Sequence, residues 1–262
     1  VGHHWLRRYP DMDPSKTSGI VYSDGTAGIH GAFACLMALR HRRRTGKGQC
    51  IELAQAETFI PYLGDAILDY SMNKRVHDSI GNRHRWAAPH GCYRCLGDDR
   101  WICISVFGDD QWRGLCRAMG DPTWTKDPQF ADAISRSRNQ DELDRRLEEW
   151  TKEREHYALM HALQKEGVPA GPVMDDRDAY NDPHLKARSY FQELTHLDCG
   201  THLYPGLAWK ASKTPNALRT APCRLGDHND YVYRKLLGIS EAEYDGLVKE
   251  GHIGTAPTPD AV

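Results

Sequence analysis

Apolar and small residues crowd into residues 25–39, GTAGIHGAFACLMAL, and leave almost no polar side on a helical wheel. This pattern predicts a helix that is buried on most sides. Asp24 stands directly before the run and suits the N-cap position. The basic residues 40–44, RHRRR, then fall on the last turn, where cations complement the helix dipole, and Gly46 supplies the stop.

The next segment predicts a short strand, a helix and a long loop. Residues 50–53, CIEL, favour the strand, and apolar residues at helical spacing favour a helix from Ala54 to about Tyr70. Pro61 predicts a kink within that helix. Residues 71–90 lose their periodicity, which is typical of a loop between domains or over a site.

Alternation of apolar and polar residues over 90–107 predicts a β-hairpin with its turn at 97–99. Asp109 or Asp110 can then cap a helix that ends near Gly120. A hairpin that leads directly into a helix indicates a mixed α/β chain.

Asn139 with Glu142 resembles a capping box that opens another helix, and a further helix is expected near 153–165. Residues 167–173, GVPAGPV, cannot be helical and predict an extended segment. The rest of the chain predicts strands and turns over 186–225, followed by short helices.

Charge and composition argue against several classes of protein. The chain has 34 basic and 36 acidic residues and a net charge of -2, whereas a nucleic-acid-binding domain usually shows a basic excess. No run approaches the roughly 18 apolar residues of a transmembrane helix, so no membrane partner is expected. No apolar core of a secretory signal follows Val1, so we expect a cytoplasmic protein whose eight cysteines are free thiols. Because Val1 is not an initiator Met, we expect a processed product or an internal piece of a longer chain.

The stretch RHRRRTGKGQ, residues 40–49, could be a nucleic-acid patch, a phosphate-binding loop or a helix end. A phosphate-binding loop precedes its helix, whereas these glycines follow one. The stretch also lacks the interleaved aromatic residues of a nucleic-acid surface. A helix end followed by a tight turn accounts for it best, and a non-catalytic interaction or nucleic-acid-binding module is the alternative.

Candidate chemistry concentrates at two turns. His90 and Gly91 stand where the long loop enters the hairpin, and Gly108 and Asp109 stand where the hairpin leads into a helix. A glycine and carboxylates at such a turn can lie over a ligand or can simply cap the helix, and both interpretations stay open. His30 is interpreted as a histidine of a core or an interface.

Cys92 and Cys95 form a C-x-x-C, the spacing of some zinc and redox sites. No second pair completes the four ligands of a structural zinc site, and the surrounding alternation does not place the pair at the start of a helix. We therefore expect no metal.

Taken in order, these segments resemble the class III CoA-transferase family, also called the CaiB–BaiF family. The resemblance lies in SDGTAGIHGAFACLMALRHRRRTGKGQCIELAQAE (23–57), GNRHRWAAPHGCYRCLGDDRWICISV (81–106), DPQFADAISRSRNQDELDRRLEEWT (127–151), LQKEGVPAGPV (163–173), NDPHLKARSYF (181–191) and APCRLGDHN (221–229). Together these stretches cover most of the chain.

The resemblance implies an α/β fold that combines the end of a Rossmann-like large domain with a smaller α/β domain, the chain crossing between them and returning. Residues 1–75 would be the C-terminal piece of the first large-domain segment, and residues 86–185 the small domain. Residues 186–250 would return to the large domain, and residues 251–262 would form a tail. The family also implies a homodimer of interlocked subunits for the full-length protein.

The implied reaction moves CoA between carboxylic acids, with an acyl-CoA and an acid as substrates and no covalently bound cofactor. An aspartate attacks the thioester to give an anhydride, the CoA thiolate returns to give an aspartyl-CoA thioester, and the acceptor acid takes the CoA. In the family this aspartate lies in a part of the fold expected upstream of Val1. The chain is therefore expected to be truncated, a fragment that is inactive alone.

A 2-methylacyl-CoA racemase-like isomerase is the alternative activity within the resemblance. In that branch an acid lies near Gly108, which makes Asp109 a catalytic candidate. The family loop that covers the active site aligns with 81–91, where this chain has few glycines. His90, Gly91, Gly108 and His30 are the candidates for contact with substrate or CoA.

Overall fold

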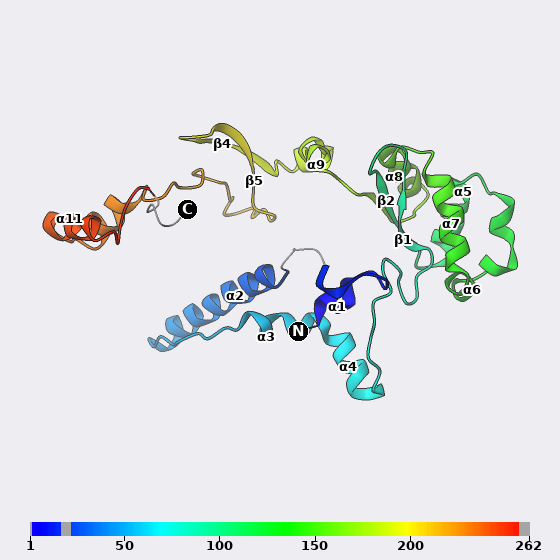
Figure 1. Cartoon of the computed structure of the whole chain (residues 1–262), viewed down its shortest axis with the longest axis horizontal. Coiled ribbons are helices and arrows are strands. Elements are labelled where there is room, and N and C mark those ends of the chain that lie inside the picture. The colour runs from blue at the N-terminus through cyan, green and yellow to red at the C-terminus, as the bar shows by residue number, and fades with distance from the viewer. Residues whose placement is uncertain (1, 17–21, 257–262) are drawn as a thin grey trace. The chain divides into compact units, whose positions relative to one another are not determined.

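The computed structural model describes residues 2–16 and 22–256, and the chain divides into two compact units, Val1–Val173 and Met174–Val262 (Figure 1). Helices and small antiparallel sheets make up the described residues, which confirms the expected α/β class at the level of mixed helices and strands. The Rossmann-like sheet and the domain limits stay predictions. Within the described ranges, no helix combines the length and apolar content that a bilayer crossing requires.

The N-terminal region of the first unit contains a long helix whose surface is largely exposed. The elements of this region are α1 (His3–Arg7), η1 (Pro14–Lys16), α2 (Tyr22–Thr45) and α3 (Gln55–Phe59). The prediction that the apolar run is buried is wrong for the described chain, because α2 has no buried residue. Ile29, Phe33 and Leu36 are 69%, 63% and 65% exposed. The helix packs chiefly against α3, and a five-residue helix is too short to cover 24 residues.

Two further expectations for this region are wrong. Asp24 is not the N-cap, because the helix has already begun at Tyr22, and its carboxylate instead accepts a hydrogen bond from Gln55. Residues 50–53 form no strand, because no neighbouring segment of the described chain pairs with them. The kink at Pro61 is confirmed: the 3-10 turn η2 (Ile60–Leu63) separates α3 from α4 (Gly64–Asn73).

The predicted hairpin is confirmed and forms the sheet of the first unit. β1 (His90–Arg94) and β2 (Trp101–Ser105) pair antiparallel, and β3 (Ala170–Pro172) joins the other edge of β2. Tyr93, Ile102 and Ile104 point to one face of the sheet and are buried.

Helices cover that face and complete the core (Figure 1). α7 (Gln140–Thr151) packs on β1, α8 (His156–Lys165) packs on β2 and β3, and α5 (Asp109–Ala118) packs on α8. Short turns and one helix connect α5 to α7: η3 (Thr123–Lys126), η4 (Pro128–Phe130) and α6 (Ala133–Arg138). Leu143, Leu147 and Leu163 are completely buried between the helices and the sheet, as their helical spacing requires.

The helix starts in this unit differ from the predicted caps. Gly108, not Asp109 or Asp110, is the N-cap of α5, and both carboxylates lie in its first turn. Asn139 precedes α7 but makes no capping bond, because its side-chain amide donates to the carbonyls of Gln129 and Ser135. Glu142 instead pairs with Arg145 and Arg146.

The second unit consists of short helices and a two-stranded sheet. Its elements are α9 (Asp176–Asn181), α10 (Pro183–Ala187), β4 (Phe191–His196), β5 (Gly200–Pro205), the π-helix η5 (Asp230–Leu236) and α11 (Glu241–Lys249). β4 and β5 pair antiparallel, as the weak alternation predicts. Ser240 and Glu243 form a capping box at the start of α11. Within the expected tail, residues 257–262 lie outside the described residues.

Candidate functional site

Two segments singled out in the sequence meet at one end of the hairpin. His90 opens β1 directly opposite Ser105, and its ring lies 6.2 Å from that of Phe107, just after β2. The ring of His84, from the incoming loop, lies 5.1 Å from His90 and 5.5 Å from Phe107. Trp86 packs on His84 with its ring 4.5 Å away. The loop before β1 and the turn after β2 thus share one aromatic cluster.

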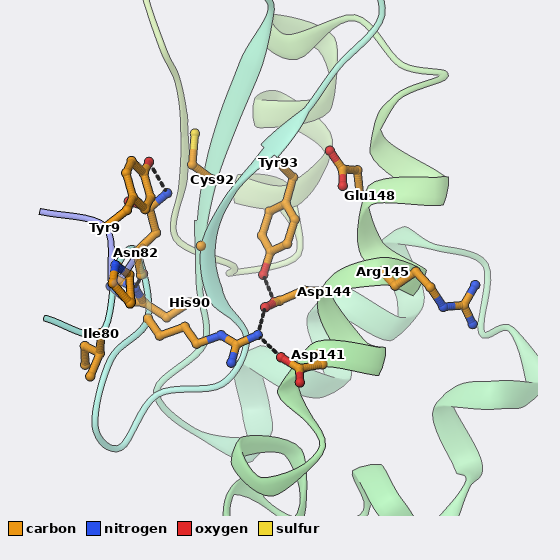
Figure 2. Close-up of a pocket in the computed structure, with 14 residues that line it drawn as sticks. Tyr9, Ile80, Asn82, His90, Cys92, Tyr93, Asp141, Asp144, Arg145 and Glu148 are labelled. Carbon is orange, nitrogen blue, oxygen red and sulfur yellow. Dashed lines mark hydrogen bonds and ion pairs between the residues drawn. The ribbon is translucent and has the colours of Figure 1, made fainter. Parts of the chain in front are cut away.

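A cleft of about 520 Å³ opens beside His90 (Figure 2). Its walls come from the N-terminal segment, from the loop before β1, from β1 itself and from one side of α7. The lining residues are Tyr9 and Pro10, residues 80–83, residues 90–93, and Asp141, Asp144, Arg145 and Glu148.

Arg83 links the incoming loop to α7 across this cleft. Its guanidinium pairs with Asp141 and lies 3.0 Å from Asp144 Oδ2. Asp144 also accepts a hydrogen bond of 2.8 Å from the Tyr93 hydroxyl (Figure 2). One carboxylate on α7 therefore holds both the loop and the first strand.

Burial sets the protonation of this network. Burial raises the pKa of Asp144, although hydrogen bonds from Tyr93 and Arg83 act against the shift. Burial also raises the pKa of Tyr93 well above its usual value, and the nearby charge of Asp144 adds to the shift. Burial alone would lower the pKa of Arg83, but its bonds to Asp141 and Asp144 outweigh that effect and raise it. At neutral pH Tyr93 is therefore a donor and Arg83 a cation.

The N-terminal wall of the cleft is fixed by Arg8, which is 7% exposed. Its guanidinium donates to the Pro10 carbonyl at 2.7 Å and to Asp78 Oδ1 at 2.9 Å. The hydroxyl of Ser79 donates in turn to the Arg8 carbonyl. Asn82 adds a bond of 3.0 Å to the Tyr9 hydroxyl. The start of the chain and the loop before β1 are joined by these bonds into one wall.

His90 and Gly91, both predicted candidates, line the cleft. His90 Nδ1 lies 2.7 Å from the carbonyl oxygen of Asn82, which can only accept, so Nδ1 carries the proton in the neutral ring. A Cβ at Gly91 would lie 2.9 Å from the Tyr93 hydroxyl. Glycine at this position thus leaves room for the hydroxyl that binds Asp144.

Gly108 and Asp109 do not line the cleft. Asp109 Oδ1 accepts a hydrogen bond of 3.0 Å from Arg136, whose side chain is almost completely buried. Arg136 also donates to the carbonyls of Ala88, at 3.0 Å, and Phe130, at 3.3 Å. The structure therefore shows Asp109 as one partner of a buried arginine that ties three segments together.

His30 lies on α2 and does not line the cleft. Its ring Nδ1 donates to the carbonyl of Thr26, one helical turn earlier, at 2.8 Å. Its ring centroid is 6.4 Å from that of Tyr62. The side chain is half-buried on a helix that lacks the core position expected from the sequence.

The two arginines that line the cleft are both paired with carboxylates. Arg83 is held by Asp141 and Asp144, and Arg145 is held by Glu142 and Glu149. Because both lining guanidiniums are paired, the cleft suits a ligand segment with amides or hydroxyls better than a phosphate. In the described part of the chain, no three His, Cys, Asp or Glu side chains are grouped to hold a metal ion.

Sequence reasoning missed most of the polar residues of the cleft. Arg83 and Asp144 stand in polar stretches where neither differs from its neighbours, and Tyr93 is one of several apolar residues in the alternating hairpin. The available signal was the glycine at 91, two residues before Tyr93. A glycine inside a strand often marks a close approach that a side chain would block, here that of the Tyr93 hydroxyl on the same face.

Comparison with known proteins shows the family to which the chain belongs. The sequence matches the family model described as CoA-transferase family III over residues 1–229. It is 27% identical over 248 residues to the succinyl-CoA–L-malate CoA-transferase beta subunit of Chloroflexus aurantiacus, covering 94% of this chain and 61% of that protein. It is 25% identical over 256 residues to the formyl-CoA:oxalate CoA-transferase of Bradyrhizobium diazoefficiens, covering 89% of this chain and 60% of that protein.

A solved structure shares the fold. The crystal structure of a CaiB/BaiF family protein from Brucella suis superposes with a TM-score of 0.77 at 28% identity, over 90% of this chain and 60% of that one. The chain thus spans about three-fifths of the length of these relatives. The resemblance found in the sequence segments is confirmed, and the chain belongs to CoA-transferase family III.

Proposed function

We propose that this chain forms part of an enzyme that transfers CoA between carboxylic acids. The observation that carries the proposal is the family match over residues 1–229, which includes every residue lining the cleft. The names of the similar proteins support it, because one acts on succinyl-CoA and malate and another on formyl-CoA and oxalate.

In this proposal an aspartate carries the acyl group and then CoA, through an anhydride and an aspartyl-CoA thioester. We place that aspartate outside residues 1–262. Asp141 and Asp144 are the aspartates of the cleft, and both are bound to Arg83, so neither carboxylate is free to attack a thioester. The coverage of about three-fifths of the relatives is consistent with a nucleophile carried by another part of the protein.

The cleft would receive a neutral part of the substrate. The pantetheine arm of CoA carries amides and a hydroxyl, which can bond to Asn82, His90 and backbone groups along the wall. The phosphates of CoA would lie elsewhere, because Arg83 and Arg145 are already paired. An interlocked homodimer remains part of the proposal for the whole protein.

A covalent-adduct experiment tests the proposal. The complete polypeptide and the 262-residue chain are each incubated with succinyl-CoA and L-malate, and with formyl-CoA and oxalate. Product acyl-CoA is measured, and the protein is digested to locate bound CoA by mass spectrometry. We expect turnover by the complete polypeptide only, with the adduct on an aspartate outside residues 1–262. An adduct within these residues, or turnover by the chain alone, would show that the nucleophile lies within residues 1–262 and would contradict the proposal.

A racemase-like isomerase is the second candidate, because the Asp109 side chain is 60% exposed at the turn after the hairpin. This activity predicts exchange of deuterium from solvent into C2 of a 2-methylacyl-CoA. We expect Asp109→Asn to leave CoA transfer intact. Deuterium exchange that Asp109→Asn abolishes, without any CoA transfer, would favour the isomerase.

A further inference from the structure

Two thiols lie side by side on the face of the first sheet that points away from the core. Cys92 of β1 and Cys103 of β2 are direct partners in the antiparallel register, and Gly171 of β3 continues the row without a side chain. Cys103 is exposed, Cys92 is half-buried, and both are free thiols. Cys95, the other cysteine of the C-x-x-C, is buried in the core and is not part of this pair.

The hydrogen-bond ladder shows which kind of position the pair occupies. Cys95 N donates to Arg100 O at 2.7 Å, and Val106 N donates to Pro89 O at 2.8 Å. Hydrogen-bonded and non-hydrogen-bonded pairs alternate along an antiparallel ladder, so Cys92 and Cys103 form a non-hydrogen-bonded pair. The Cα atoms of such a pair lie about 4.5 Å apart, within the range of about 4.4 to 6.8 Å that a disulfide spans.

We propose that Cys92 and Cys103 form a reversible dithiol–disulfide site that reacts with hydroperoxides. Cross-strand register places the two sulfurs in contact range, and exposure of Cys103 lets the oxidant reach it. The site is independent of the proposed CoA transfer, because it rests on the hairpin alone.

The two thiols divide the chemistry between them. A hydrogen bond from Cys92 lowers the pKa of Cys103 to about 6; burial opposes the shift and nearby His90 adds to it. The same hydrogen bond, together with burial, raises the pKa of Cys92 far above its ordinary value. Since the thiolate is the nucleophile, Cys103 attacks first and Cys92 resolves.

The reaction balances with hydrogen peroxide as the oxidant. Cys103 Sγ attacks one peroxide oxygen, the O–O bond breaks, and the leaving hydroxide takes a proton to become water. The resulting sulfenic acid on Cys103 is then attacked by Cys92 Sγ, so that the S–S bond forms and the S–O bond breaks. The second hydroxide leaves as water with the proton of Cys92. Two thiols thus lose two electrons, and one peroxide becomes two waters.

Oxidation of this pair would change a side chain that lines the cleft. Cys92 lines the cleft, so a bond to Cys103 turns its side chain toward β2 and ties the wall strand to its neighbour. A dithiol reductant would restore the open pair.

Tryptic mapping tests the site in a way that this sequence makes unambiguous. Arginines at 85, 94, 100 and 113 place Cys92, Cys95 and Cys103 in separate peptides, 86–94, 95–100 and 101–113. After treatment with hydrogen peroxide and blocking of free thiols, we expect 86–94 linked to 101–113, with loss of two hydrogens. A link to 95–100, sulfinic acid on Cys103 without a link, or no oxidation at either residue would overturn the proposal.

Alkylation rates test the division of roles. At pH 6 a thiol of pKa about 6 is about half thiolate, whereas a thiol of pKa 8.5 is about 0.3% thiolate. The thiolate of lower pKa is also intrinsically less nucleophilic, which reduces this rate advantage by about one order of magnitude. We therefore expect iodoacetamide to modify Cys103 about tenfold faster than the exposed thiols Cys50 and Cys223. Cys92→Ala should remove this advantage while the circular dichroism spectrum is kept, and Cys50→Ala should not. Equal rates at Cys103 and Cys50 in the unmodified protein would contradict the proposal.

Discussion

The buried guanidinium of Arg136 lies 3.0 Å from the carboxylate of Asp109, and this bond joins α6 to the first turn of α5. Arg136 also binds the carbonyls of Ala88 and Phe130, so one side chain satisfies backbone groups of two further segments. The end of the loop before β1 is thereby held against the helices. The shape of the site therefore depends on a residue that does not line it.

Replacement of Arg136 by Met should be strongly destabilising. Two buried carbonyls and Asp109 would lose their donor, and we expect a loss of about 3 kcal/mol in the free energy of unfolding. Urea unfolding measures this change. Arg138→Met, on the exposed side of the same helix, is the matched control and should change stability by less than about 0.5 kcal/mol. Equal midpoints for the two variants would contradict the role assigned to Arg136.

Replacement of Tyr93 by Phe should remove the hydroxyl that binds Asp144 without changing the packing of the ring. Because the hydroxyl is buried, we expect a cost of about 1–2 kcal/mol at pH 8. The folded-state pKa of Tyr93 is raised, chiefly by burial, so the hydroxyl contributes fully below the unfolded pKa of about 10. Above that pH the unfolded state loses its proton first, and the contribution falls as the pH rises toward the folded pKa.

The measurement is the stability difference between wild type and Tyr93→Phe in urea at pH 8, 10 and 11. This difference in the free energy of unfolding should become smaller from pH 8 to pH 11. A difference that stays constant or widens would show that Tyr93 is not the protected donor of the cleft.

Replacement of Glu155 by Ala should remove the N-cap of α8. Its carboxylate accepts from the backbone N–H groups of Tyr157, at 3.0 Å, and Ala158, at 2.7 Å, so the expected cost is about 0.5–2 kcal/mol at pH 7. Burial alone would raise the pKa of Glu155, but these two bonds and His156 outweigh it and lower the pKa. The contribution is therefore full above the unfolded pKa of about 4.3 and is lost as the pH falls through the folded pKa.

Thermal or urea unfolding at pH 7 and pH 3 checks the cap. Glu153→Ala, an exposed glutamate just before the cap, is the control and should show little change at either pH. The cap would be refuted by a Glu155→Ala deficit that is as large at pH 3 as at pH 7.

Replacement of Gly114 by Ala should disturb the contact between α5 and α8. A Cβ there would overlap the carbonyl oxygen of Glu166 and lie 3.2 Å from Val168, so we expect a cost of about 1–3 kcal/mol. Gly246→Ala is the control, because this glycine also lies inside a helix but has no neighbouring atom within 4 Å. The control should be neutral or stabilise by up to about 1 kcal/mol. Similar unfolding midpoints for the two variants would remove the close packing as an explanation.

Local patterns predicted the hairpin, α5, α7 and α8, because each depends on neighbours close in sequence. The glycines and prolines of 167–173 predicted an extended segment, and residues 170–172 form a strand only through their pairing with β2. The strand at 50–53 was wrong for the opposite reason: a strand exists only if another segment pairs with it. The apolar run on α2 likewise identified a face suited to burial, but a helical wheel contains no information about what covers that face.

The site was only partly visible in the sequence. His90 and Gly91 were found because a glycine at a loop-to-strand junction stands out, whereas Arg83 and Asp144, 61 positions apart, meet only through the fold. Cys92 and Cys103 could have been paired from the hairpin register alone. The C-x-x-C spacing instead suggested a pairing of Cys92 with Cys95, which faces the core.

The bond between Arg8 and Asp78 closes a segment of seventy positions that leaves the cleft wall and returns to it. All of α2, α3 and α4 lies inside this segment. The entropy of closing a loop grows only slowly with its length, so residues added within this segment should weaken the Arg8–Asp78 bond little. A change in the length of the helical segment therefore need not disturb the wall of the cleft, provided that the packing of the His3 ring on Phe59 is kept.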